Sequence, residues 1–119
     1  MALGKIKADT LEHSTAGSLD TQYIVEGAAK AYIQYLQATP VISVSFNISS
    51  VTDSQTGDFT INYTNAFASD AHARSLMSNS TTFCGSQARG TSTDRFETRQ
   101  HDNTLIDTGN YGTITGDLA

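Results

Sequence analysis

The chain has 119 residues, of which 38% are apolar, and this length supports one small domain with a modest core. The formal net charge is −5 and the seven Lys and Arg residues are scattered, with Lys5 and Lys7 as the nearest pair, so we expect neither nucleic acid nor a membrane as a partner. Cys84 is the single cysteine, which excludes an intrachain disulfide, and no apolar run approaches the roughly 20 residues of a membrane-spanning helix.

The composition favours strands that are joined by many turns, because Ser and Thr together make up 30 residues. The modest apolar content also favours oligomerisation as a source of stability. The N-terminus lacks the long apolar core of a signal peptide, so we expect synthesis in a cytoplasm and no export by the general secretory route.

The first part of the chain predicts an extended N-terminal arm. Residues 1–20 are polar and rich in Gly, Ser and Thr, with Leu3, Ile6 and Leu11 as isolated apolar residues. Such a segment is typical of an arm or linker that orders when it packs on a partner. We therefore expect an arm over residues 1–20 and a β-domain over residues 21–119.

Two short segments open the β-domain. Residues 22–26 (QYIVE) predict a first strand, which ends at the glycine that follows. Residues 28–38 fit two alternatives, because their Ala, Leu, Lys and Gln suit a helix while Ala31, Ile33 and Tyr35 alternate with their neighbours as in a strand. Propensity alone favours the helix, and the choice of a strand comes from the resemblance given below.

The clearest pattern lies over residues 41–64. Apolar and polar residues alternate in 41–50 and again in 59–64, on either side of a turn-forming linker. A period of two in adjacent runs predicts an antiparallel hairpin whose inward side chains form the core. The residues expected to build this core are Ile42, Val44, Phe46, Phe59, Ile61 and Tyr63.

The second half of the chain continues the β pattern. Residues 65–74 are small and mixed, and they predict an irregular crossing. Further strands are predicted at 81–84, 94–99 and 111–115, with glycines marking the breaks. About six short strands at this spacing predict an all-β fold, either a small antiparallel β-sandwich or an open barrel.

Residues with chemical potential are sparse. No two of His13, His72 and His101 have the short spacing of a metal site, and a remote cluster of His72, Cys84 and His101 competes with structural histidines. A free cysteine in a strand is more often a small buried side chain than a nucleophile. We expect no catalytic, metal-binding or cofactor-binding residues.

Two acidic patterns also favour structural roles. Residues 53–58 have some of the oxygen ligands of a calcium loop but lack its further acidic ligands, so we predict a hairpin turn. Asp94 and Glu97 are three residues apart, which places them on opposite faces of a strand and argues against a glycosidase pair.

Surface modification and sugar contact are weaker signals. We expect the glycosylation sequons that begin at Asn47, Asn62 and Asn79 to be coincidental. Tyrosine rings can stack on sugars, but we expect most of these residues in the core or in a subunit interface. The tyrosines are Tyr23, Tyr32, Tyr35, Tyr63 and Tyr111.

Three stretches carry a family resemblance. Residues 11–33 (LEHSTAGSLDTQYIVEGAAKAYI), 46–53 (FNISSVTD) and 56–64 (TGDFTINYT) resemble small β-domain virion structural proteins of tailed bacteriophages, of the marine and cyanophage type. The resemblance covers about residues 8–68. In that family an aromatic residue, here Tyr32, follows the Ala-Lys-Ala motif and begins a strand, which is why we expect a strand in this region.

The resemblance implies a non-enzymatic structural protein of the virion, assembled in the host cytoplasm, and it supplies no catalytic residues. Our first expectation is a tail-fibre-like appendage component on the particle exterior. It would be a homotrimer whose arm attaches to other virion proteins, either tail protein or major capsid protein. The alternatives are a capsid decoration (cement) protein that stabilises the head, and a carbohydrate-binding module whose exposed Tyr and Asn contact a host surface glycan.

Overall fold

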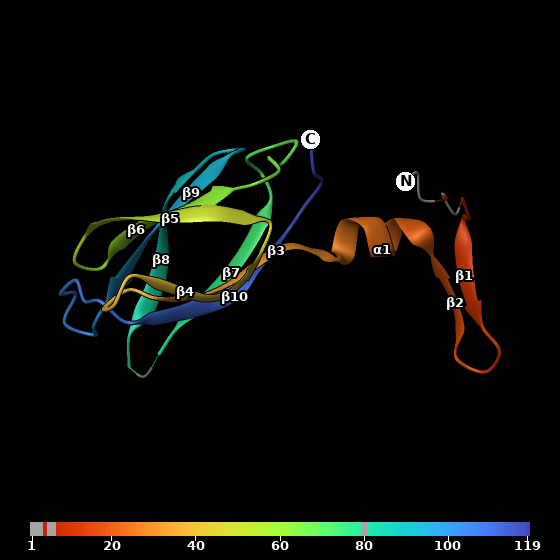
Figure 1. The fold of residues 1–119 in the computed structure, drawn as a ribbon. Coiled ribbons are helices and arrows are strands. Elements are labelled where there is room, and N and C mark those ends of the chain that lie inside the picture. Colours follow the sequence, from red (N-terminus) through yellow and green to blue (C-terminus); the bar gives the residue numbers. More distant parts are fainter. Residues whose placement is uncertain (1–3, 5–6, 80) are drawn as a thin grey trace.

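The described chain is built mostly of strands, which form two antiparallel sheets packed face to face and preceded by a hairpin and a short helix (Figure 1). A computed structural model of the chain describes residue 4, residues 7–79 and residues 81–119. The elements are β1 (Thr10–His13), β2 (Gly17–Asp20), α1 (Thr21–Gly27), β3 (Ala29–Leu36), β4 (Val41–Phe46), β5 (Ile48–Gln55), β6 (Asp58–Tyr63), β7 (Ala73–Ser78), β8 (Phe83–Arg89), β9 (Thr93–Arg99) and β10 (Gly109–Thr115).

The predicted fold class is confirmed. One sheet has the strand order β4-β3-β10-β7 and the other has the order β5-β6-β9-β8, and every pairing is antiparallel. We call them the first and the second sheet. The strands predicted near 94–99 and 111–115 are β9 and β10, and the strand predicted at 81–84 forms slightly later in the chain as β8. The arrangement is a small β-sandwich, as the alternating pattern predicts.

The segment predicted as a first strand, residues 22–26, is instead the helix α1, so that prediction was wrong. A strand must find a neighbour for its backbone groups, whereas a helix pairs them within the segment. The Ala28 N–H donates to the Ile24 carbonyl at 3.1 Å, and the Lys30 ammonium donates to the carbonyls of Val25 and Ala28. These contacts satisfy the C-terminal end of the helix and place a positive charge there.

The ambiguous segment 28–38 is a strand, β3, so the choice of a strand over a helix is confirmed. Ala31, Ile33 and Tyr35 are buried while the residues between them are exposed. β3 pairs with β4 on one side and with β10 on the other, which makes it a central strand of the first sheet.

The single hairpin predicted over residues 41–64 is wrong in one respect, because its first strand divides at Asn47. Asn47 has a φ of +57°, a conformation that Asn tolerates better than most residues, and the chain passes here from β4 in the first sheet to β5 in the second. The hairpin itself joins β5 and β6 through a turn at Thr56 and Gly57. The first strand of the hairpin therefore runs further into the predicted linker than expected, to Gln55, and the turn lies directly before β6.

The core predictions are confirmed for one strand and corrected for the other. Phe59, Ile61 and Tyr63 of β6 are buried. Val44 and Phe46 are not, because they are 48% and 54% exposed. In the register of β3 with β4, Tyr35 lies opposite Ile42 and Gln34 opposite Val44, so β4 has one extra residue, Ser43. This bulge turns the following apolar residues to the outside and leaves only Ile42 partly buried against the core.

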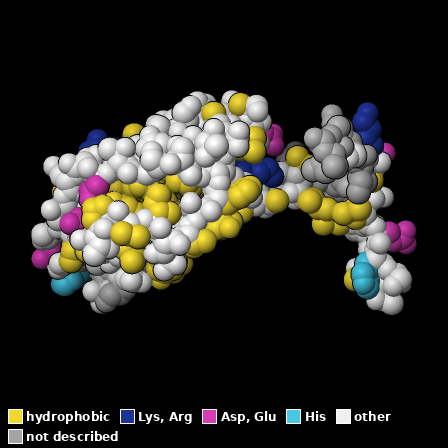
Figure 2. Space-filling view, viewed as in Figure 1, with side chains coloured by type: hydrophobic (Ala, Val, Ile, Leu, Met, Phe, Trp, Pro, Cys, Tyr) yellow, Lys and Arg dark blue, Asp and Glu magenta, His cyan; other side chains and the backbone are white. Residues whose placement is uncertain are grey.

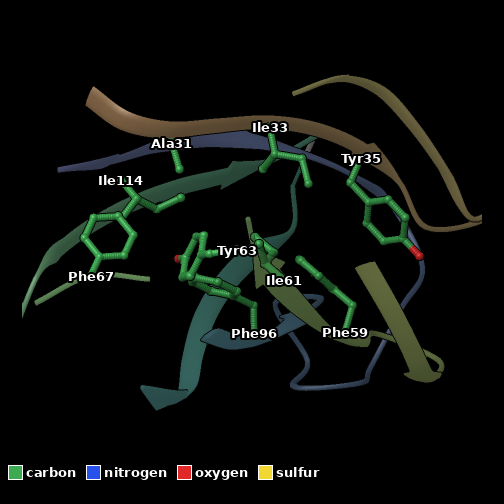
Figure 3. Packing of buried hydrophobic residues seen from close by; sticks show 9 residues of the cluster. All are labelled: Ala31, Ile33, Tyr35, Phe59, Ile61, Tyr63, Phe67, Phe96 and Ile114. Carbon is green, nitrogen blue, oxygen red and sulfur yellow. The ribbon is translucent and has the colours of Figure 1, made fainter. Parts of the chain in front are cut away.

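The core lies between the sheets and is rich in aromatic rings (Figure 3). Ring centroids are 5.3 Å apart for Tyr35 and Phe59, 5.8 Å for Phe59 and Phe96, and 4.9 Å for Tyr63 and Phe67. Such tilted, offset and edge-on contacts are favourable for aromatic pairs. The buried hydrophobic residues are Ala31, Ile33, Tyr35, Phe59, Ile61, Tyr63, Phe67, Phe96 and Ile114.

The segment predicted as an irregular crossing, residues 65–74, overlaps a strand that sequence analysis missed. Phe67 anchors the crossing in the core and forms an isolated bridge with Leu118, but β7 begins at Ala73 and pairs with β10. Arg74 and Ser78 alternate with outward residues of this strand, so its inner face is partly polar and lacks an apolar period of two.

The N-terminal part of the structure extends away from the sandwich (Figure 1). β1 and β2 pair as a hairpin from Thr10 opposite Asp20 to His13 opposite Gly17. The Thr21 N–H donates to the Asp9 carbonyl at 2.8 Å, which joins the hairpin to the start of α1. We call the described residues 7–28 the arm. The two sheets begin after it, at β3, and the principal extents of the molecule are 50 × 34 × 25 Å.

Candidate functional site

A cluster of polar side chains lies inside the sandwich around Asp94 of β9. The Asp94 side chain is 0% exposed, and its carboxylate accepts hydrogen bonds from three groups. Tyr63 donates its hydroxyl, His72 Nε2 lies 2.6 Å from Oδ2, and Arg74 Nη1 lies 3.0 Å from Oδ1. Three donors on one carboxylate offset the loss of hydration that its burial requires.

His72 is held by its surroundings on every side. Its Nδ1 lies 3.0 Å from the Ser69 carbonyl, so both ring nitrogens face oxygen acceptors. The ring also stacks on Phe67 with centroids 4.2 Å apart. His72 therefore joins the 65–74 crossing to β9 and has no free nitrogen in this arrangement.

A surface hollow of about 520 Å³ opens beside this cluster, between β7 and β8. His72 and Cys84 both border it, so the structure brings together two members of the remote cluster considered from the sequence. The third member, His101, is exposed in the turn after β9 and is not among the residues that line the hollow. Within residues 4, 7–79 and 81–119, no three His, Cys, Asp or Glu side chains form a group that could hold a metal ion.

Cys84 is poorly suited to act as a nucleophile. Burial raises the pKa of its thiol to about 12. A thiol is reactive as the thiolate, so at neutral pH Cys84 is almost entirely in its unreactive form. Because both nitrogens of His72 are engaged elsewhere, the histidine does not supply the base that would activate it.

The other carboxylates hold strands of the second sheet. Asp58 faces Arg95, whose Nε donates to Oδ1 at 2.8 Å and whose Nη2 donates to Oδ2. These hydrogen bonds hold the pKa of Asp58 below its ordinary value. Glu97 accepts from Arg99 Nη2 and from Gln87 Nε2, each at 2.7 Å. The Asp58–Arg95 pair thus links β6 to β9, while Glu97 pairs with Arg99 of its own strand and reaches β8 through the uncharged Gln87.

The predictions for the two acidic patterns are confirmed. Residues 53–58 contain the turn of the β5–β6 hairpin, at Thr56 and Gly57, where Gly57 has a φ of +68° and its N–H donates to Asp107 Oδ1 at 2.7 Å. Asp94 points into the buried cluster while Glu97 pairs on the other face of β9, so they do not face each other. Sequence analysis missed the cluster around Asp94. The signal was the shared face of Asp94 with Phe96, an apolar residue two positions later.

The tyrosines divide into two groups. Tyr35 and Tyr63 are buried in the core, whereas Tyr23, Tyr32 and Tyr111 are exposed, so the core holds two of the five and not most of them. Tyr23 lies on α1, while Tyr32 and Tyr111 lie on the outer face of the first sheet. The exposed rings are therefore available for contact with another molecule.

The outer face of the first sheet is unusually apolar. Seven large side chains from β3, β4, β7 and β10 are each 37–61% exposed there. Hydrophobic side chains follow the lower edge of the sandwich and continue along α1 in the space-filling view (Figure 2). We call this set the apolar face, and it consists of Tyr32, Leu36, Val41, Val44, Phe46, Met77 and Tyr111.

The arm adds a second exposed apolar region. Leu11, Ile24 and Val25 line a hollow of about 560 Å³ between the hairpin and α1. Leu19 and Tyr23 are also exposed on the arm.

No helix in the described part of the chain is both long enough and apolar enough to cross a membrane.

Comparison with protein-family models, with curated proteins and with solved structures found no match to this chain. The function must therefore be inferred from the geometry and from the sequence resemblance alone.

Proposed function

We propose that this chain is a non-enzymatic structural protein of a bacteriophage virion, and that it is a tail-fibre-like appendage component on the particle exterior. The observation that carries the proposal is the arm, which leaves the sandwich with apolar side chains exposed. Leu11, Ile24 and Val25 have no place in the core of their own domain, so the arm is suited to docking on another protein. The phage resemblance begins at about residue 8 and thus includes the arm.

The polar interior supports an architectural role. Asp94, His72, Arg74 and Tyr63 satisfy one another inside the sandwich, and Cys84 beside them is held as a thiol. A catalytic site needs groups that can exchange protons or bonds with a substrate. These groups are instead used to hold β6, β7, β9 and the 65–74 crossing together.

Assembly as a homotrimer fits both exposed apolar regions, because a particle exterior supplies neighbours that cover them. The second candidate is a capsid decoration protein, in which the same arm grips neighbouring capsid subunits. The third is a carbohydrate-binding module, for which the exposed rings of Tyr32 and Tyr111 on the outer face of one sheet are the supporting observation.

The first test is a cryo-EM map of the virion that carries this chain, with the chain located by its side-chain density. Density on the tail is the expected result, with the arm in contact with another virion protein. Density at threefold or quasi-threefold positions of the head would replace the appendage role with the decoration role. A virion that lacks the chain altogether would overturn both.

The second test addresses the arm. Ile24→Glu places a charge among the apolar residues of α1. Gln22→Glu adds the same charge to an exposed polar residue about half a helical turn earlier. We expect Ile24→Glu to abolish incorporation into particles and Gln22→Glu to leave it intact, with both sandwiches folded by circular dichroism. Equal incorporation of the two variants would refute docking through the arm.

A further inference from the structure

The outward positions of the first sheet share one property beyond their apolar character, which is that they carry almost no charge. Strand register assigns these positions, since every second residue of a strand lies on the same face. Besides the apolar face, they include Gln34, Ala73, Ser75, Gly109 and Thr113, and also Lys30 at the start of β3. The Lys30 ammonium lies at the edge next to the arm, where it donates to the carbonyls of Val25 and Ala28. A sheet of four strands that faced water in the working protein would be expected to carry several charged side chains across its outer face.

The second sheet provides the comparison within the same molecule. Its outer face has hydroxyl and amide side chains, such as Thr60 and Asn62, beside the charges of Arg95 and Glu97. Asn62 Nδ2 donates to Ser50 Oγ at 3.1 Å and to Thr52 Oγ1 at 3.2 Å, forming a polar network across two strands. This face is suited to water, and the contrast shows that the apolar face is specific to one sheet.

The apolar face is continuous across all four strands. Tyr32 lies opposite Phe46, and their rings stack with centroids 5.8 Å apart. Leu36 lies opposite Val41, and Tyr111 lies opposite Met77 on the other side of β3. Gln34, an uncharged residue, lies opposite both Val44 and Tyr111, and strands about 4.8 Å apart bring diagonal neighbours within reach of long side chains, so the two groups form one surface.

The area is sufficient for a stable protein contact. Seven large side chains of about 150–200 Å² each, roughly half exposed, present about 500–700 Å² of apolar surface. The largest apolar patch of an ordinary monomer is about 300–600 Å², and a standard interface buries about 800 Å² on each partner. The apolar face with its polar rim reaches the size of one side of such an interface.

We propose that the apolar face is the surface on which copies of this chain associate, each packing its own apolar face against that of a second copy. Electrostatics favours this occupant. Each copy has a formal net charge of −5, so two copies repel each other wherever acidic groups meet. The apolar face has no charged residue, which makes it a place where two identical copies approach without like-charge contacts. A charged partner would find no complement there.

The inference goes beyond the proposed homotrimer, because a face-to-face contact joins chains in pairs and would exist beside any threefold contact. It rests on the proposed function for its biological meaning, but it is tested on the purified chain. Sedimentation velocity over a wide concentration range measures the mass relative to the 12.7 kDa chain. We expect reversible association into a species of twice that mass, because each apolar face meets that of one other copy. Phe46→Glu should weaken the association at least about 100-fold, because it places a charge in a desolvated interface.

Two variants make the test specific. Thr60→Glu adds the same charge to the outer face of the second sheet and should leave the association unchanged. Met77→Glu alters the far edge of the apolar face and should act like Phe46→Glu, which covers the case that one of the two variants fails to fold. Circular dichroism and thermal unfolding verify the fold of each variant.

Several results would overturn the inference. A wild-type chain that stays monomeric at about millimolar concentration would refute it, as would Thr60→Glu weakening association as much as Phe46→Glu. A monomer that binds a glycan through Tyr32 would assign the apolar face to sugar instead. If the purified chain associates as expected but is absent from virions, the self-association surface stands and the proposed function fails.

Discussion

Replacement of Asp94 by Asn tests the central claim about the interior, that this carboxylate is structural. Asn keeps the size of the side chain but removes its charge and turns one acceptor oxygen into a donor. The donors from Tyr63, His72 and Arg74 then meet an amide that cannot accept from all of them. The Arg74 side chain is only 10% exposed and would lose its counter-charge.

The magnitude follows from this burial. Breaking a buried ion pair by removing one partner costs about 3–5 kcal/mol, because the remaining charge stays buried and uncompensated. For a chain of this length the change corresponds to a fall in Tm of about 12–20 °C, at roughly 4 °C per kcal/mol. Urea denaturation gives the free energy of unfolding directly, and the slope m should not change if the fold is retained.

The control is Asp70→Asn, which removes the same charge from an exposed side chain and should change the stability by less than about 0.5 kcal/mol. Arg74→Met combined with Asp94→Asn should cost less than the sum of the single changes, because the two groups share one contact. A loss below about 1 kcal/mol for Asp94→Asn, or strictly additive losses in the double variant, would refute the structural reading of the cluster.

Three further changes test local geometry. Gly57→Ala should cost at least about 1–2 kcal/mol in urea denaturation, because the φ of +68° disfavours a side chain and a Cβ would lie 2.6 Å from the Thr98 carbonyl oxygen. The pKa of Asp58 is lowered in the folded state by its hydrogen bonds from Arg95, so its contribution to stability should be complete above the ordinary Asp value of 3.8 and should be lost as the pH falls below it. Asp58→Asn should therefore flatten the acid limb of a plot of stability against pH, and an unchanged limb would contradict the assignment. Cys84 in the folded chain should react with iodoacetamide at pH 8 at least about 100-fold more slowly than in the urea-unfolded chain, since burial raises the pKa of its thiol to about 12.

The parts of the fold that sequence could predict are those in which local pattern and tertiary environment agree. Phe59, Ile61 and Tyr63 alternate with polar residues, and β6 is a central strand with one face on the core, so the period of two identifies both the strand and its inward side. β9 and β10 lie close to their predicted positions, but buried polar residues such as Asp94 and Asn110 interrupt their inward faces, so the pattern gives these strands and not their inward sides. Fold class thus follows from several short amphipathic strands and does not need the tertiary contacts.

The failures have physical causes that a period of two cannot reveal. An extra residue at Ser43 reverses the faces of β4, although no Gly or other special residue marks the bulge. Arg74 points inward on β7 because it donates to the buried Asp94 carboxylate. A charged residue on the inner face interrupts the apolar alternation by which a strand is recognised in a sequence. Residues 22–26 have strand propensity but no neighbouring strand, so the helix is favoured.

The site was less predictable than the fold. Tyr63, His72, Arg74 and Asp94 span more than 30 residues of sequence, and only the packing of β6, β7 and β9 brings them together. No spacing rule links such residues, unlike the short spacings of metal sites. The one cue was that Asp94 shares a side of its strand with the apolar Phe96. An acidic residue in such a position predicts a buried partner of opposite charge.

The exposed positions of Val44 and Phe46 connect the correction in the fold to the proposed assembly. Alternation along a strand shows that two faces differ, but it does not show what covers the apolar one. In the isolated chain these side chains face outward, beside Tyr32 on the neighbouring strand. A second copy on the apolar face would bury them between chains, so the same apolar pattern that suits a core would then serve an interface. Phe46→Glu separates the two roles. It should leave the free energy of unfolding of the dilute monomer within about 1 kcal/mol of wild type, because Phe46 is not in the core, while it weakens association at least about 100-fold. A large loss of monomer stability would instead show that Phe46 belongs to the core and that the bulge in β4 is misassigned.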